Sequence, residues 1–204
     1  YTQFADYLTT VVKHFKDEWG ITFRTLEPQN EPDNGWTVNG GQEGCSFSYE
    51  NQAKLITEVK KKIDEKQLST VISAPDGSSY GATIGAYNSY NATIKSYISQ
   101  INTHGYFGGS RTDLQALAAR DGKRLWSSEI DGSGADYPFD QWKHDHNDIV
   151  PGLDIANRVI RDLRDLKANG WVFWQVVESE QAQTNLNKNW GCIHADFNGG
   201  NKYY

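Results

Sequence analysis

Residues 21–32, with the sequence ITFRTLEPQNEP, combine a short β-type run with an abrupt stop. The run covers Ile21 to Leu26 and ends at Glu27-Pro28. A loop rich in Gly and Asn follows, from Asp33 to Phe47. Apolar residues at helical spacing precede the run, at Phe4, Leu8, Val11, Val12 and Phe15. Gly20 stops that helix, so the segment is predicted to be a strand between a helix and a long loop.

The same alternation continues along the chain. Further helices are predicted over residues 56–63, 84–101, 114–120 and 155–166, and further strands over residues 70–74, 102–107, 124–128 and 171–177. Strands that alternate with helices indicate a parallel sheet, either open or closed into a barrel. No Gly-x-Gly-x-x-Gly or phosphate-loop motif opens a helix, which argues against a nucleotide-binding sheet. Long polar segments follow the strand ends, where a barrel carries its function.

The length of the chain limits how much of a barrel it can form. A (β/α)8 TIM barrel needs about 250 residues, whereas this α/β chain has 204. Residues 1–204 are therefore predicted to be a partial catalytic barrel with its first three β/α units missing. Tyr1 and the lack of any Met indicate an excerpted or processed chain. The net charge of -6 and the lack of a long apolar run predict neither nucleic acid nor membrane as a partner.

Four short motifs lie at the ends of predicted strands. Asn30-Glu31-Pro32 follows the first strand, and His104-Gly105-Tyr106 ends the third. Leu125-Trp126-Ser127-Ser128-Glu129 ends the fourth, and Val172-Phe173-Trp174-Gln175 lies at the end of the last. In this order they resemble the acid/base, His-x-Tyr, nucleophile and tryptophan motifs of the large clan of glycoside hydrolases built on (β/α)8 barrels.

The closest resemblance is to glycoside hydrolase family 30, and it covers essentially the whole chain. The loop Gln42-Glu43-Gly44-Cys45 and the ending Trp174-Gln175 look most like the endo-β-1,6-galactanase branch of that family. Family members carry an additional β-domain formed from both chain ends, of which this sequence has almost none. The resemblance implies a secreted, monomeric enzyme that acts on a polysaccharide or oligosaccharide without a cofactor or a metal.

The resemblance also implies roles for particular residues. Glu31 would be the general acid and later the base, and Glu129 would be the nucleophile of a retaining double displacement. The carboxyl groups of such a pair lie about 5–5.5 Å apart. Tyr106 would donate a hydrogen bond to Glu129, and Asn30 would bond the sugar 2-hydroxyl. Trp174 would present its face to the sugar ring.

Three more residues are candidates for substrate binding, namely His104, Trp126 and Trp36. Each aromatic or histidine candidate also has a plainer interpretation. Trp126 and Trp174 are large residues that often belong to a core. His104 is favoured as a hydrogen-bonded structural histidine over a proton carrier. Trp36 serves equally well as a subsite wall or as an anchor of its loop.

Several charged residues outside these assignments have alternative interpretations. Glu31 alone, before a proline, would suggest a turn, and Glu27 is its rival, with a structural or electrostatic role favoured. Glu178 and Glu180 are predicted to be rim carboxylates that touch substrate hydroxyls. The segment 143–148, KHDHND, offers metal-binding residue types. Its residues are adjacent in a loop, which favours a solvated segment over a metal site.

The leading hypothesis is a retaining, endo-acting hydrolase of β-1,6-galactan. Family 30 enzymes that cut xylan, β-1,6-glucan or glucosylceramide share the mechanism and stay as alternatives. A non-catalytic carbohydrate-binding fragment is an alternative of another class, because five strands leave two sheet edges unpaired. A metal-dependent hydrolase would need histidines at strand ends, where only His104 lies. Cys45 and Cys192 are predicted to be free thiols, on opposite sides of a closed barrel.

Overall fold

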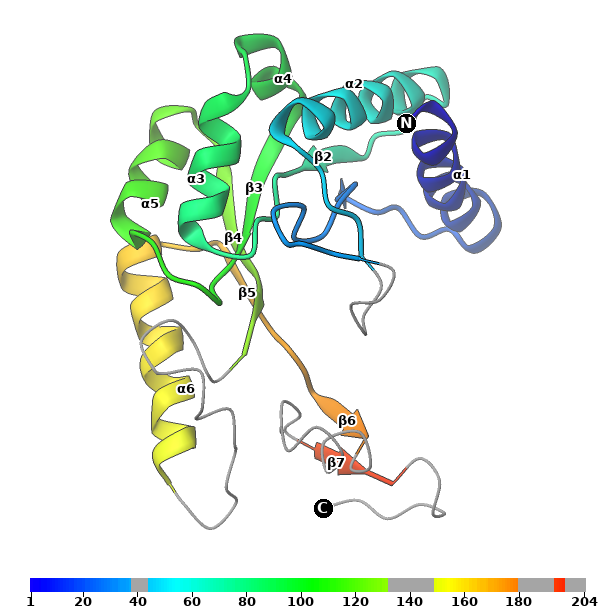
Figure 1. Ribbon diagram of the computed structural model, residues 1–204. Helices are drawn as coiled ribbons and strands as arrows, with labels where there is room; N and C mark the ends of the chain where they lie inside the picture. The colour runs from blue at the N-terminus through cyan, green and yellow to red at the C-terminus, as the bar shows by residue number, and fades with distance from the viewer. Residues whose placement is uncertain (38–43, 132–148, 180–192, 197–204) are drawn as a thin grey trace.

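The computed structural model of the chain describes residues 1–37, 44–131, 149–179 and 193–196. Its main feature is one sheet of five parallel strands in the order β1-β2-β3-β4-β5 (Figure 1). The strands are β1 (Thr25–Leu26), β2 (Val71–Ser73), β3 (Ile98–His104), β4 (Arg124–Ile130) and β5 (Gly170–Phe173). Each strand pairs in parallel with the next one in the chain. The sheet is therefore half of an α/β barrel, as the sequence predicts.

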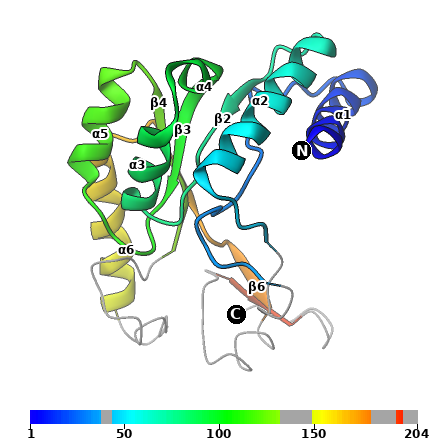
Figure 2. The ribbon, with the colours of Figure 1, turned by 45° about the horizontal axis from the view of Figure 1, so that its top comes forward.

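Helices connect the strands and lie along one side of the sheet, from α1 at one end to α6 at the other (Figures 1 and 2). They are α1 (Thr2–Trp19), α2 (Tyr49–Glu65), α3 (Tyr80–Ser89), α4 (Ala92–Tyr97), α5 (Arg111–Arg120) and α6 (Val150–Arg161), which continues into a π-helical turn, η2 (Asp162–Leu166). The helices α2 to α5 each begin at a Ser or Asn whose side chain accepts a backbone hydrogen bond. Gly20 ends α1 at φ 68°, which glycine adopts without steric cost.

The apolar core lies between the helices and the sheet. Ile72, Ile101 and Leu125 on the strands join one cluster with side chains from the helices. The helical members include Leu55, Ile56, Val59, Ile63, Tyr87, Leu114 and Leu117. Burying one such aliphatic side chain contributes roughly 1.5–3 kcal/mol, so this layer stabilises the order of the strands.

The opposite face of the sheet is polar. Gln100 and Asn102 alternate with Ile101 along β3, so their side chains leave the face that the helices cover. Gln100 Nε2 donates to Asn102 Oδ1 at 2.6 Å, and Arg24 Nη2 donates to Gln100 Oε1 at 2.8 Å. Asn102 Nδ2 donates to Glu27 Oε2. A chain of hydrogen bonds therefore crosses the interior of the half-barrel toward the strand ends.

The predicted helix over residues 84–101 is interrupted at Tyr90-Asn91, and its last four residues form a strand instead. The helix α3 ends at Ser89, Asn91 begins the separate short helix α4, and β3 already starts at Ile98. Ile94, Ile98 and Ile101 are spaced by four and three residues, which imitates one face of a helix. In the structure β3 lies between β2 and β4 and is buried on both faces. Apolar residues on such a strand need not alternate, so their spacing misleads.

The predicted last strand, residues 171–177, is also divided. The strand β5 ends at Phe173, and β6 (Val177–Ser179) is separate. It pairs in parallel with β7 (Ile193–Ala195) in a second, two-stranded sheet. Trp174 therefore lies between β5 and β6 and not within a strand, and its peptide bond to Gln175 is cis.

Candidate active site

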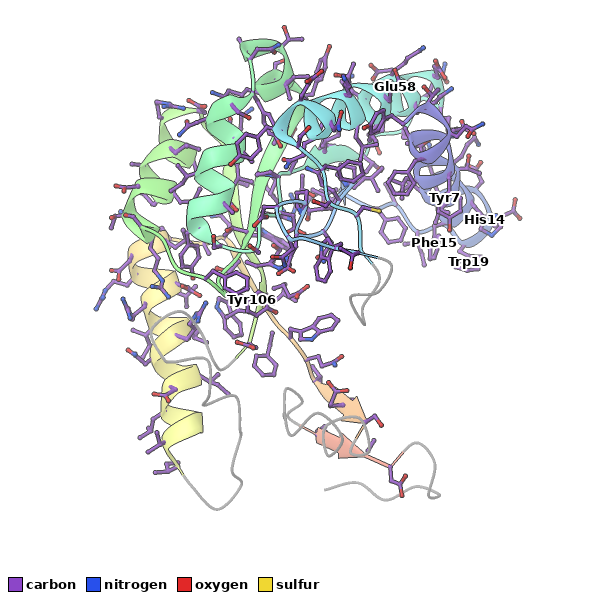
Figure 3. All side chains as sticks on the ribbon, viewed as in Figure 1. Tyr7, His14, Phe15, Trp19, Glu58 and Tyr106 are labelled. Atoms are coloured by element: carbon purple, nitrogen blue, oxygen red, sulfur yellow. The ribbon has the colours of Figure 1, made fainter. Side chains whose placement is uncertain are left out.

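Four neighbouring strands bring their carboxyl ends to one edge of the sheet. Glu31 follows β1, Asp76 follows β2, His104 is the last residue of β3 and Glu129 lies near the end of β4. The register pairs His104 with Glu129. Figure 3 shows Tyr106 at this end of the sheet, far from the labelled side chains of α1. Function in barrels is found at this edge of the strands.

Glu31 is held by its own loop. It is 5% exposed, and its backbone has φ 43°, a left-handed conformation that side chains other than glycine rarely adopt. The Glu31 amide donates to the Asp76 carbonyl at 3.0 Å, and the Trp36 indole nitrogen donates to the Glu31 carbonyl at 2.9 Å. Asn34 Nδ2 donates to Glu31 Oε2 at 2.5 Å. A left-handed residue costs about 1–3 kcal/mol, so such contacts are needed to fix it.

Glu129 is half-buried on β4. The Tyr106 hydroxyl donates to Glu129 Oε1 at 2.9 Å, which confirms the predicted hydrogen bond. Burial and the charge of Glu129 raise the pKa of Tyr106, so this hydroxyl stays protonated and donates. Burial also raises the pKa of Glu129 above its ordinary value, whereas the charge of His104 and the Tyr106 hydrogen bond oppose that rise. These two partners therefore favour the ionised form of Glu129.

The two glutamates lie close together. One carboxylate oxygen of Glu31, one of Glu129 and a ring nitrogen of His104 are all within 4.8 Å of one another. The expected separation of about 5–5.5 Å between the carboxyl groups agrees with this spacing. An inverting pair, at roughly 6.5–9.5 Å, would be farther apart.

His104 occupies the space between the carboxylates and is 1% exposed. Its Nδ1 lies 2.9 Å from Glu31 Oε1 and 3.7 Å from Glu129 Oε1. Its Nε2 lies 3.3 Å from Asp76 Oδ2. Burial lowers the pKa of the imidazole, but the charge of Asp76 and the hydrogen bonds to Asp76 and Glu31 raise it well above its usual range. These acidic neighbours therefore favour the imidazolium form of His104.

Sequence reasoning missed Asp76 and Asn34. Asp76 is 5% exposed, and Ser128 Oγ donates to its Oδ1 at 2.6 Å. The available signal was its place between Pro75 and Gly77, directly after a predicted strand. Asn34 gave no signal, because the loop after Glu31 is rich in such residues.

The rival carboxylate, Glu27, points elsewhere. It accepts the hydrogen bond from Asn102 at the end of the interior polar chain. Burial and then the charge of Asp76 raise the pKa of Glu27 well above its ordinary value, which favours the neutral acid. Its place on the inner face agrees with the structural or electrostatic role that the sequence favoured.

The tryptophans differ in their surroundings. Trp36 donates to the Glu31 carbonyl and packs on Gly44, where an added Cβ would meet the indole at 2.4 Å, so it does anchor its loop. Trp126 pairs with Gly170 in the sheet and lies under the Arg24 guanidinium at 5.3 Å. It is three residues before Glu129, roughly 10 Å lower along the strand, and so lies away from the carboxylates.

Trp174 is 43% exposed, and Asn30 is exposed beside Glu31, so both are accessible to a ligand. Glu178 accepts a hydrogen bond from Gln175. Cys45 is an exposed free thiol, as predicted. The segment 143–148, Glu180 and Cys192 lie outside the described residues.

Within the described ranges, Glu31, His104 and Glu129 also form the group that could offer three donor atoms to a metal ion. Protein partners already engage these groups, since Glu31 Oε1 faces His104 and Glu129 Oε1 accepts from Tyr106. The expectation of a metal-free and cofactor-free site stays a prediction.

A half-barrel of parallel strands with two glutamates at nearby strand ends is the arrangement of the barrel class of glycoside hydrolases. Comparison with known families agrees with this class. The model described as O-glycosyl hydrolase family 30 matches residues 1–104. The chain belongs to O-glycosyl hydrolase family 30.

Relatives and solved structures extend the comparison. An endo-β-1,6-galactanase of Hypocrea rufa is 30% identical, over 96% of this chain and 37% of its own length. An exo-β-1,6-galactobiohydrolase of Bifidobacterium longum subsp. longum is 27% identical, over 97% of this chain and 13% of its own length. The catalytic domain of a family 30 xylanase C from Talaromyces cellulolyticus shares the fold, with TM-score 0.66 and 20% identity over 100% of this chain and 42% of that chain. The chain spans less than half the length of these proteins.

Proposed function

We propose that the complete protein is a retaining endo-β-1,6-galactanase in which Glu31 is the acid/base and Glu129 the nucleophile. The observation that carries the proposal is the close pair itself, with carboxylate oxygens within 4.8 Å of each other. This spacing suits direct attack by one carboxylate, whereas an inverting pair must leave room for a water molecule between the carboxylate and the sugar.

In the first step, a Glu129 oxygen forms a bond to the anomeric carbon while the glycosidic carbon–oxygen bond breaks. Glu31 transfers its proton to the departing oxygen. Tyr106, which donates to Glu129 Oε1 at 2.9 Å, orients the nucleophile. In the second step Glu31 removes a proton from water, and the water oxygen displaces Glu129. Two displacements at one carbon give net retention.

Two accessible residues are proposed to hold the sugar. Asn30, exposed next to Glu31, would bond the 2-hydroxyl, a contact that strengthens in the transition state. The exposed indole of Trp174 would stack on the ring face. The relatives named as a β-1,6-galactanase and a β-1,6-galactobiohydrolase support a β-1,6-linked galactan as the substrate.

We further propose that three β/α units and an accessory β-domain complete the barrel. Among the described residues β1 pairs only with β2, and β5 only with β4. Large apolar side chains on α1 are exposed, including Tyr7 at 64% and Trp19 at 59%. Such edges and faces need cover in a stable barrel.

We propose that the enzyme is secreted, because a polysaccharide substrate is met outside the cell, and that it is a monomer, as the family resemblance implies. None of the helices in the described ranges is long and apolar enough to span a membrane.

The test is a screen of the complete enzyme against β-1,6-galactan, xylan and β-1,6-glucan with sizing of the products. Early release of mixed galacto-oligosaccharides is expected from an endo-galactanase, whereas release of galactobiose alone would show exo action. Proton NMR of the first anomer formed is expected to show the β-product. An α-product would overturn the retaining mechanism, and cleavage of xylan or glucan alone would overturn the substrate.

A further inference from the structure

His104 has carboxylates on both sides of its ring. Nδ1 faces Glu31 at 2.9 Å, and Nε2 faces Asp76 at 3.3 Å. A neutral imidazole carries one N–H, and an imidazolium carries two. Among the described residues Asp76 is the polar partner that faces Nε2, so an N–H toward its carboxylate accounts for that contact in either charge state. Asp76 therefore fixes the tautomer and leaves Nδ1 as the atom that faces Glu31.

The position of Asp76 is itself fixed. Its Oδ1 accepts from Ser128 Oγ at 2.6 Å, and its carbonyl accepts from the Glu31 amide at 3.0 Å. It is 5% exposed. One residue thus contacts the His104 ring through its side chain and the Glu31 loop through its backbone.

We propose that Asp76 is a positioning residue which, through His104, holds one positive charge against both Glu31 and Glu129 and so sets the pH range in which the enzyme works. The inference rests on the proposed function of the two glutamates. When Glu31 is a carboxylate, after it has protonated the leaving group, His104 Nδ1–H donates to it. When Glu31 carries its proton on Oε2, the same Nδ1–H donates to the unprotonated Oε1, so His104 keeps its charge.

The charge that His104 carries depends on the ionisable groups around it. Among the described residues, those that act on it are the acids Glu27, Glu31, Asp76 and Glu129, and the Tyr106 ring packs against it. Asp131 lies near Tyr106, and the Arg158 guanidinium donates to the carbonyl of Gly105, the residue after His104. Asp76 is the one among these groups that faces Nε2 and has no part in bond cleavage, so it is the group to change.

The experiment compares the pH profile of kcat/KM for the wild-type complete enzyme and for Asp76→Asn, on an aryl β-galactoside and on galactan. The amide keeps the shape but removes the charge, so His104 loses its proton more readily. Without that cation both glutamates hold their protons more tightly. Both limbs of the profile are expected to move upward by about one pH unit, with about tenfold lower activity on the acid side.

The direction of the shift is decisive. If Asp76 acted only as a nearby negative charge, its removal would ease ionisation of both glutamates and move the limbs downward. A merely structural role would lower activity at every pH and leave the limbs in place. Either result would overturn the proposal. Asp33→Asn is the matched control, because Asp33 accepts hydrogen bonds from Ser78 at the same end of the sheet and its limbs should stay in place.

A second measurement needs no substitution at Asp76. Nitrogen-15 NMR of histidine-labelled wild-type enzyme, with His104 assigned by comparison with His104→Gln, is expected to show an imidazolium at neutral pH. A neutral ring, with its proton on either nitrogen, would overturn the proposal even if Asp76→Asn does not fold. It would do so independently of the proposed function, which fails if Glu129→Ala remains active.

Discussion

Glu31 and Glu129 reach the same site from two different kinds of backbone. Glu129 lies on the seven-residue strand β4, and the ladder with β3 pairs it with His104. Glu31 follows the two-residue strand β1 and lies in a loop with φ 43°. Its position depends on hydrogen bonds with neighbours such as Asn34 and Trp36. The sheet positions one carboxylate, whereas side-chain contacts position the other.

The largest expected effect separates the two glutamates themselves. Glu129→Ala should lower turnover by on the order of 10⁴-fold or more with every substrate, because it removes the carboxylate that attacks the anomeric carbon. Glu31→Ala should still react with an aryl glycoside that has a good leaving group, and the glycosyl intermediate should accumulate on Glu129. The burst of leaving group and the mass of the intermediate measure this difference.

Azide sharpens the same comparison, because it is a nucleophile that needs no base. It should rescue Glu31→Ala and give a β-glycosyl azide, and it should give the α-azide with Glu129→Ala by direct displacement. An α-product from Glu31→Ala would mean that the two roles are reversed. If neither substitution changed the rate, the assignment as a glycosidase would be wrong.

A smaller effect is expected from loss of the hydrogen bond that Tyr106 donates to Glu129. Tyr106→Phe removes a hydrogen bond to a charged group, which contributes about 1.5–3 kcal/mol. Turnover should therefore fall by roughly 10- to 100-fold, while the fold stays nearly intact. Steady-state kinetics and circular dichroism of the complete enzyme measure both. Tyr7→Phe, on α1 and far from the carboxylates, is the control (Figure 3). Equal rates in the two variants would show that the hydrogen bond has no catalytic role.

Loss of a contact that holds the Glu31 loop should have a more selective effect. Trp36→Phe removes the hydrogen bond to the Glu31 carbonyl, a neutral contact of about 0.5–1.5 kcal/mol, or roughly two- to tenfold in rate. Galactan, whose leaving group needs the acid, should be affected in its first step, whereas the burst with an activated aryl glycoside should not. Trp19→Phe, on α1 and far from the carboxylates, is the matched change (Figure 3). An equal loss with both substrates would contradict a loop that positions the acid alone.

The smallest effect is expected at Glu27, and it concerns the stability of the fold. Burial raises its pKa in the folded state well above its usual value. A carboxyl whose pKa is raised in the folded protein destabilises the fold once the pH rises above the pKa of about 4.3 that it has in the unfolded chain. Glu27→Gln should therefore melt at a higher temperature than wild type at neutral pH, and the difference should vanish near pH 4. Thermal unfolding across pH, with the exposed Glu18→Gln as control, measures this. A lower melting temperature at neutral pH would show that Glu27 is ionised.

The sequence was most informative where chemistry and a strand end coincide. Glu31, His104, Tyr106 and Glu129 each belong to a short motif after a β-type run, and the structure brings all four together. Parallel strands make this possible, because their carboxyl ends meet at one edge whatever the length of the helices between them. Five strands in chain order were predictable for the same reason.

The sequence was least informative where position depends on contacts between segments. The role of Asp76 depends on its contacts with His104 and Ser128, which come from two other strands. Trp126 belongs to the motif that ends at Glu129, yet its pairing with Gly170 places it in the sheet, away from the strand ends. Ile98 kept helical spacing although it starts a strand, because burial on both faces removes the alternation that marks most strands.

All the strand ends that build the candidate site belong to one uninterrupted run of neighbours, β1 to β4. The contacts that orient Glu31, His104 and Glu129 are therefore internal to this half of the sheet. For enzyme engineering the chain is consequently a unit of recombination. Fusing it to the first half of a relative with another glycan preference should transplant the reaction chemistry together with Asn30 and Trp174, while the new half supplies the rest of the sugar site.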